Sequence, residues 1–158
     1  MPDHFASLRE TSDYQPPSAP QTAGSFRVLA VEDDIDSAEA LLLSLQQWGY
    51  DARVCTSGHE ALALAPAYRP SVVLLDIRLP DFDGWNLARK LREYGVHAPM
   101  IAVTALGEGD DYYRSNKVGI DFHLVKPDFK PQLRQILDRI KRDSSAKRPP
   151  TRFASAGD

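Results

Sequence analysis

The run VVLLDIRLPDFDG, residues 72–84, is the most informative part of this 158-residue chain. Its first residues belong to an almost wholly apolar segment, 71–75, which the carboxylate of Asp76 follows directly. Short, unbroken apolar segments are typical of strands that helices cover on both faces. A helical pattern follows at about residues 85–94, and Gly95 is placed to end it. The run therefore predicts a buried strand that leads through a turn into a helix.

The same alternation of apolar runs and helical periods recurs along the chain. Four more strands are predicted, at residues 26–31, 50–56, 100–104 and 122–125. Further helices are predicted at about residues 38–48, 59–65 and 110–118, and after Asp128. Pro66 should kink or shorten the helix at 59–65. Strands that alternate with helices in this way predict βαβ units and an α/β fold with a parallel sheet.

Composition predicts one folded domain, residues 25–142, between two flexible tails. Residues 1–24 and 143–158 contain few large apolar side chains, so they cannot bury enough surface to offset the cost of ordering. A chain of this length has little room for a second folded domain, and we expect a single-domain protein. The one cysteine, Cys55, lies in an alternating run and is predicted to be a buried structural thiol.

Bulk properties argue against several classes of protein. No apolar run approaches the roughly 20 residues of a membrane-spanning helix. The N-terminus lacks the apolar stretch of a secretory signal, so we expect a cytoplasmic protein. A net charge of -3 creates no overall positive electrostatic field that would attract nucleic acid or acidic membranes. Another protein is therefore the expected partner.

Acid, hydroxyl and amine groups stand at the carboxyl ends of four predicted strands. They are Glu32 and Asp33 after the first strand, Asp76 after the third, Thr104 ending the fourth, and Lys126 after the fifth. A single polar residue at a strand end is weak evidence for a site, because strands commonly end in polar residues where the chain becomes exposed to solvent. In a parallel sheet, however, these ends lie on one edge, where open α/β folds bind ligands. We therefore expect the five side chains to share one cleft.

The chemistry of this cluster points to a metal and a phosphoryl group. Three neighbouring carboxylates repel one another, and a hard cation relieves the repulsion. Glu32, Asp33 and Asp76 suit Mg²⁺ or Mn²⁺, which prefer oxygen ligands, whereas no Cys/His cluster supports structural zinc. Lys126 adds a positive charge, and Thr104 adds a rotatable hydroxyl. Together they predict a site for an acidic nucleophile and an incoming phosphoryl group.

These motifs resemble those of the response-regulator receiver domain of two-component signalling. The matching segments are VLAVEDD at 28–34, VVLLDIRLPDFDG at 72–84, Thr104 with Ala105, and HLVKP at 123–127. The resemblance covers about residues 26–141. It implies a flavodoxin-like, doubly wound α/β fold with five parallel strands in the order 2-1-3-4-5 and five helices. The HLVKP run is also similar to receivers that work with hybrid histidine kinases.

The resemblance implies a role for each acidic residue. Asp76 matches the phosphoacceptor, Asp33 a direct metal ligand, and Glu32 a ligand that acts through water. The backbone carbonyl of Arg78 would be the remaining protein ligand. Many receivers have aspartate where this chain has Glu32, a change that should preserve the contact through water.

Further roles are implied at the fourth and fifth strands. Thr104 and Lys126 match the residues that contact the phosphoryl group, and the Lys126–Pro127 bond matches one that is typically cis. Thr104 and His123 match the pair that responds to phosphorylation, although the family usually has Tyr or Phe at the position of His123. An edge-strand side chain without a signalling role is an equal alternative for His123.

The function implied is that of a phosphorylation switch, which catalyses only its own phosphorylation and dephosphorylation. A histidine kinase or histidine phosphotransfer protein would donate the phosphoryl group to Asp76 in a reaction that needs Mg²⁺. The domain, a monomer or weak dimer, would then signal to an unknown downstream protein without binding nucleic acid or membrane. Two alternatives stay open. One is a pure interaction module, although none of the five site residues is missing. The other is a metal-dependent phosphohydrolase, although Arg78 interrupts the common Asp-x-Asp arrangement.

Other acidic residues are expected to shape the backbone. Asp34 and Asp36 are placed to help cap the first helix rather than to bind metal. Asp81 and Asp83 lie in the turn before the helix at 85–94, where they serve backbone geometry.

Overall fold

Five strands form one parallel sheet in a computed structural model of the chain, which describes residues 26–105, 114, 115 and 117–147. The strands are β1 (Arg27–Val31), β2 (Asp51–Cys55), β3 (Val72–Leu75), β4 (Met100–Thr104) and β5 (Phe122–Val125). Their order is β2-β1-β3-β4-β5, and each neighbouring pair runs parallel. The flavodoxin-like order is therefore confirmed.

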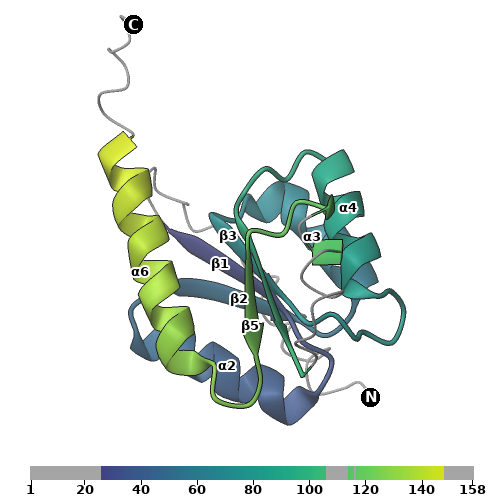
Figure 1. The fold of residues 1–158 in the computed structure, drawn as a ribbon, viewed down its shortest axis with the longest axis horizontal. Helices are drawn as coiled ribbons and strands as arrows, with labels where there is room; N and C mark the ends of the chain where they lie inside the picture. Colours follow the sequence, from purple (N-terminus) through teal and green to yellow (C-terminus); the bar gives the residue numbers. More distant parts are fainter. Residues whose placement is uncertain (1–25, 106–113, 116, 148–158) are drawn as a thin grey trace, which may run out of the picture.

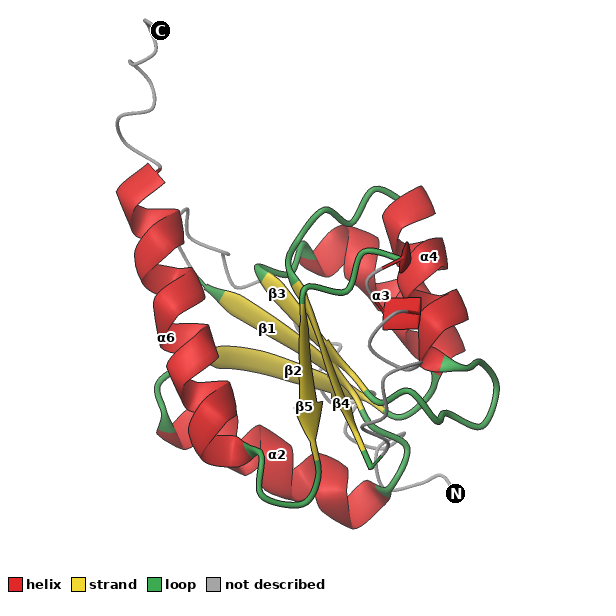
Figure 2. Cartoon of the chain, viewed as in Figure 1, coloured by secondary structure: helices red, strands yellow, loops and turns green. Residues whose placement is uncertain are grey.

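Helices cover both faces of the sheet (Figure 1). In the described part of the chain they are α2 (Ile35–Gln47), α3 (Gly58–Tyr68), α4 (Gly84–Glu93) and α6 (Lys130–Lys147). Helices α2 and α6 lie on one face and α3 and α4 on the other (Figure 2). The helix predicted at 110–118 falls mostly outside the described residues, of which 114, 115 and 117 are helical. None of the helices described is both long and apolar enough to cross a membrane.

Two helices extend further than predicted. Pro66 lies inside α3, which continues to Tyr68, so the helix is not shortened at this residue, and the other expected effect, a kink, stays a prediction. Proline removes one backbone donor. In the last turn this loss leaves the packing of the buried Ala65 and Tyr68 intact. At the other end of the chain, α6 runs to Lys147, so the segment predicted to be a tail from residue 143 begins as helix.

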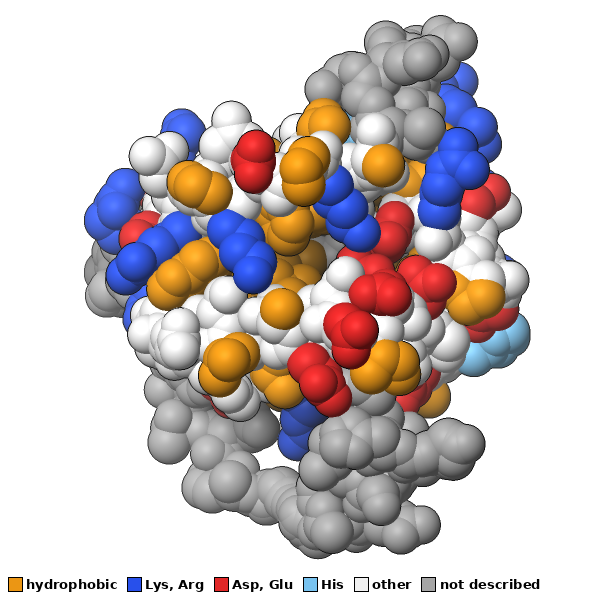
Figure 3. Space-filling view, turned by 90° about the horizontal axis from the view of Figure 1, so that it is seen from below, with side chains coloured by type: hydrophobic (Ala, Val, Ile, Leu, Met, Phe, Trp, Pro, Cys, Tyr) orange, Lys and Arg blue, Asp and Glu red, His pale blue; other side chains and the backbone are white. Residues whose placement is uncertain are grey.

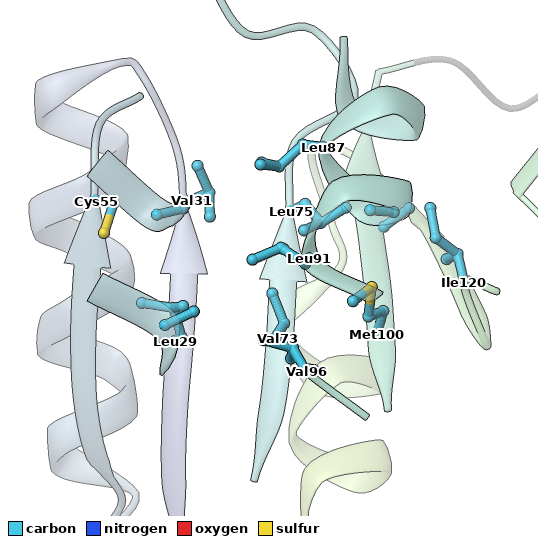
Figure 4. Close-up of a cluster of buried hydrophobic side chains, with 14 of the residues drawn as sticks. Leu29, Val31, Cys55, Val73, Leu75, Leu87, Leu91, Val96, Met100 and Ile120 are labelled. Atoms are coloured by element: carbon cyan, nitrogen blue, oxygen red, sulfur yellow. The ribbon is translucent and has the colours of Figure 1, made fainter. Parts of the chain in front are cut away.

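Alternate residues of the central strands face opposite sides and build two apolar cores. Figure 4 shows one of them, where Leu87 and Leu91 of α4 meet the sheet near Leu75. The thiol of Cys55 is buried in this core, as predicted. The helices of the opposite core contribute Leu41, Leu45, Leu133 and Leu137. The two cores fix the strands between helices and leave their carboxyl ends free to carry polar groups.

Candidate functional site

The ends of β1 and β3 bring three acidic side chains together. Glu32, Asp33 and Asp76 each place a carboxylate oxygen within 4.8 Å of the others. Two backbone bonds support this arrangement: the N–H of Glu32 donates to the Cys55 carbonyl at 2.9 Å, and that of Asp76 to the Val31 carbonyl at 3.1 Å. Glu32 and Asp76 are buried, whereas Asp33 is exposed. The donor set is all oxygen, which fits Mg²⁺ or Mn²⁺.

Lys126 supplies a positive charge to this acidic cluster. Its Nζ donates to Glu32 Oε1 at 2.9 Å and to Asp76 Oδ2 at 3.1 Å. Partial burial acts to lower the pKa of Lys126, but the hydrogen bond to Glu32 and the charge of Asp76 outweigh it, so the pKa lies above its ordinary value. The amine is therefore held in its charged form between two carboxylates.

The backbone after β3 holds the other carboxylate oxygen of Asp76. The N–H of Arg78 donates to Oδ1 at 3.0 Å. Gly84, the first residue of α4, packs against the same backbone. A Cβ at Gly84 would lie 2.8 Å from the Asp76 carbonyl oxygen and 2.6 Å from Ile77 Cα. The start of α4 thus braces the segment that carries Asp76, while a metal contact from the Arg78 carbonyl stays a prediction.

Thr104 and Lys126 end neighbouring strands. Thr104 is fully buried, and its carbonyl accepts the backbone N–H of Lys126 at 2.8 Å. Because β4 lies between β3 and β5, Thr104 stands between the strand ends that carry Asp76 and Lys126. The Lys126–Pro127 peptide bond is cis. His123 is half-buried on β5, and its role as a switch residue stays a prediction.

Asp34 orients the cluster as well as capping α2. As predicted, its side chain accepts the N–H of Ser37 at 2.9 Å, and its hydrogen bonds to Ser37 lower the pKa of Asp34. Its own N–H donates to Glu32 Oε2 at 3.2 Å. Glu32 is therefore bonded at both oxygens, because Lys126 holds the other. Asp36 lies in the first turn of α2 instead of at the cap.

Acidic side chains gather in a band on the face of the molecule seen from below (Figure 3). In Figure 1 strand β5 points toward this face. Lys and Arg side chains flank the band. Because a phosphoryl group is itself anionic, it approaches such a band favourably only when positive charge is present within it.

A chain of polar contacts near α4 was not predicted. Trp85 Nε1 donates to Ser115 Oγ at 3.0 Å, and Ser115 Oγ lies 3.4 Å from His123 Nδ1. No sequence motif marks Ser115, because it lies in a polar stretch without an apolar period. Its burial, at 3 % exposed, depends on segments distant in sequence.

Comparison with known proteins assigns the chain to a family. The model of the response regulator receiver domain matches residues 28–138, and the chain belongs to this family. Receiver domains are phosphoacceptor switches of two-component systems. The fold, the order of the strands and the acidic cluster all agree with this assignment.

Several relatives, named as response regulators or transcriptional regulatory proteins, are longer than this chain. Response regulator MprA of Mycobacterium leprae is 33% identical over 125 residues, which cover 77% of this chain and 55% of that protein. Transcriptional regulatory protein TrcR of Mycobacterium tuberculosis is 31% identical over 134 residues, which cover 84% and 52%. The chain thus spans about half the length of these relatives.

Solved receiver structures agree with the fold. The chemotaxis protein CheY4 of Vibrio cholerae has 28% identity and a TM-score of 0.70, with 73% of this chain and 98% of that chain covered. A CheY-like receiver domain protein of Methanospirillum hungatei JF-1 has 25% identity and a TM-score of 0.67, with 75% and 98% covered.

Proposed function

We propose that this receiver domain accepts a phosphoryl group from a phosphohistidine onto Asp76 in a Mg²⁺-dependent reaction. The observation that carries the proposal is the placement of one amine, Lys126 Nζ, against both Asp76 and Glu32, with Asp33 alongside. This combines a carboxylate nucleophile, a fixed positive charge and oxygen ligands for a cation. The donor would be a histidine kinase or a histidine phosphotransfer protein, as is usual for receiver domains.

In the proposed reaction an oxygen of Asp76 attacks phosphorus while the bond from phosphorus to the histidine nitrogen breaks. The imidazole leaves with the bonding electron pair. A bound divalent cation would supply positive charge to the phosphoryl oxygens. Lys126 would add its ammonium charge, and the Thr104 hydroxyl would donate to a phosphoryl oxygen. Catalysis in this scheme is positioning and charge neutralisation, with no protein group that forms a further covalent bond.

The output in this proposal is a changed protein-binding surface. An acyl phosphate adds roughly one unit of negative charge beyond the carboxylate it replaces. Thr104 would move toward it, His123 would repack, and a downstream protein would bind the two states with different affinity. A single-domain arrangement, a monomer or weak dimer, a cytoplasmic location and the absence of nucleic-acid binding all stay predictions.

Intact-mass spectrometry with acetyl phosphate tests the assignment. We expect addition of one phosphoryl group per chain with Mg²⁺ and none after chelation of the metal. Asp76→Asn should abolish labelling while circular dichroism shows an unchanged fold. Asp143→Asn is a matched control, because it makes the same charge change on the exposed face of α6. Full labelling of Asp76→Asn would refute the proposal.

A further inference from the structure

The turn between β3 and α4 is attached to the starts of two helices. The side chain of Asp83 accepts the N–H of Asn86 at 2.8 Å and caps α4. Two residues earlier, the carboxylate of Asp81 accepts the N–H groups of Gly58 at 3.0 Å and His59 at 2.9 Å at the start of α3. The turn therefore joins α3, which precedes β3 in the chain, to α4, which follows the turn.

The base of this turn contacts the proposed phosphoacceptor. The N–H of Arg78 donates to Asp76 Oδ1 at 3.0 Å. Arg78 and Asp83 form an antiparallel bridge that closes the turn. The hydrogen bond beside this bridge runs from the Gly84 N–H to the Ile77 carbonyl at 2.6 Å, so it does not use the Arg78 carbonyl, the predicted metal ligand. Because residues 78–83 are closed at their base, they tilt as one unit, and a contact at the tip sets the direction of that carbonyl.

Asp81 and Phe82 hold the tip of the turn against α3. The centres of the Phe82 and His59 rings lie 4.9 Å apart, and a Cβ at Gly58 would clash with the Phe82 ring. Apolar packing of this kind has little directional preference, whereas hydrogen bonds weaken steeply as their angle departs from linear. The two bonds that Asp81 accepts therefore fix the orientation of the turn, and Phe82 adds packing.

Helix α3 also has a cap of its own. The side chain of Ser57, the residue before α3, accepts the N–H of Glu60 at 3.1 Å. Helices begin with several N–H groups that have no partner within the helix. Ser57 accepts one of these groups and Asp81 accepts two others. Both caps should stabilise α3, but Asp81 also attaches the helix to the segment that carries Arg78.

We infer that Asp81 is a positioning residue for the proposed metal site. Through its bonds to α3 it holds residues 78–83 in the orientation in which the Arg78 carbonyl can reach a cation bound by Asp33 and Asp76. Mg²⁺ demands near-ideal octahedral geometry, so loss of this support weakens its binding even though Asp81 is not itself a ligand. This role deepens the proposed function and rests on it, because it takes the Arg78 carbonyl as a ligand of the cation.

Calorimetric titration with Mg²⁺ tests this role. Asp81→Ala should weaken Mg²⁺ binding by about tenfold, the lower end of the loss usual when contacts that orient a metal ligand are removed. Ser57→Ala is the matched control, because it removes a cap from the same end of α3 without touching the turn. It should lower the free energy of unfolding in urea and leave the Mg²⁺ affinity unchanged. Asp36→Ala, which removes an exposed carboxylate from the first turn of α2, measures the effect of charge alone and should lose less affinity than Asp81→Ala.

Amide hydrogen exchange in the metal-free protein gives a second measurement. The Arg78 N–H, which donates to Asp76, should exchange faster in Asp81→Ala than in Ser57→Ala. Mg²⁺ affinity that is unchanged in Asp81→Ala, or that falls as far in Ser57→Ala or Asp36→Ala, overturns the inference, as does equal exchange at Arg78. An original chain that binds Mg²⁺ but takes up no phosphoryl group from acetyl phosphate would instead overturn the proposed function, and the comparison of affinities would still decide the role of Asp81.

Discussion

Lys126 reaches from the end of β5 past β4 to Asp76 at the end of β3, where its Nζ lies 3.1 Å from Oδ2. The same nitrogen lies 2.9 Å from Glu32 Oε1. One ammonium therefore offsets charge from two buried carboxylates, each costly to bury alone. The ammonium of Lys126 also competes with a bound divalent cation for these two carboxylates. Lys126 should consequently affect both metal binding and phosphoryl transfer, in opposite directions.

Lys126→Gln should slow labelling by acetyl phosphate by about a hundredfold, the usual effect of removing one group that stabilises transition-state charge. It should also strengthen Mg²⁺ binding, because a competing cation is gone. Initial rates from intact-mass spectrometry and calorimetric titration measure the two effects. Lys141→Gln is the control, since Lys141 lies over the Tyr50 ring before β2. Equal rates in the original chain and Lys126→Gln would contradict the proposed role.

Gly84→Ala should destabilise the domain and impair the site. The added carbon would meet the Asp76 carbonyl oxygen at 2.8 Å and Ile77 Cα at 2.6 Å, and both are backbone atoms that cannot turn aside. Overpacking of this kind costs roughly 1–3 kcal/mol. That exceeds the roughly 0.5–1 kcal/mol that alanine gains over glycine in a helix. Urea denaturation should show the loss, and labelling of Asp76 should slow.

Gly58→Ala provides a contrast with Gly84→Ala. Its added carbon would clash with the ring of Phe82, which is a side chain rather than backbone. Phe82→Ala in the same chain should therefore remove the clash, so that the cost of the double change falls below the sum of the single costs. Truncation of Ile77 to Val should give Gly84→Ala no such relief. Full recovery of stability in the double variant Gly84→Ala, Ile77→Val would show that the contact with backbone atoms is not what destabilises Gly84→Ala.

Much of the fold was predictable because its signals are local. The unbroken apolar run VVLL is enough to predict the buried strand. Asp76 follows this strand directly, so the topology of a parallel sheet places it at the carboxyl edge. The strand order came from the resemblance rather than from periodicity. Asp34 was recognised as a cap because its partner, Ser37, lies only three residues away. The positions of site residues could therefore be predicted where the end of a strand determines them.

Features that depend on distant contacts were not predictable. Pro66 was expected to kink or shorten α3, yet the helix continues to Tyr68 with Ala65 and Tyr68 buried. Ser115 carries no motif, and its burial becomes apparent only when α4 and β5 lie beside it. Asp81 was assigned to its own turn. In the structure it also caps α3, which precedes it by more than twenty residues.

Arg92→Lys should loosen the loop between α4 and β4. The guanidinium donates to the carbonyls of Val96 at 3.0 Å, Ala98 at 2.7 Å and Gly119 at 2.6 Å. Lysine has a single nitrogen and cannot reproduce this fork. Leaving partly buried carbonyls without a donor costs roughly 1–3 kcal/mol. Urea denaturation should show this loss, and Arg89→Lys, an exposed change on the same helix, should leave stability nearly unaltered.

Asp81 should make stability depend on acid pH. Its carboxylate accepts the N–H groups of Gly58 at 3.0 Å and His59 at 2.9 Å at the start of α3, and it contacts the His59 ring at 2.5 Å. Partial burial acts to raise the pKa of Asp81, but the bonds from Gly58 and His59 outweigh it, so the pKa lies below its ordinary 3.8.

A carboxyl with a lowered folded-state pKa contributes stability above its unfolded pKa and loses it as the pH falls through the folded value. Asp81→Asn should therefore lower the free energy of unfolding at neutral pH, by roughly 0.5–1 kcal/mol because solvent screens the charge. The difference from the original chain should shrink once the pH falls below 3.8. Asp143→Asn, on the exposed face of α6, should show no such convergence. Urea denaturation across this pH range measures the free energy of unfolding of both variants. A difference between Asp81→Asn and the original chain that does not change with pH would exclude an ionised Asp81 as a cap of α3.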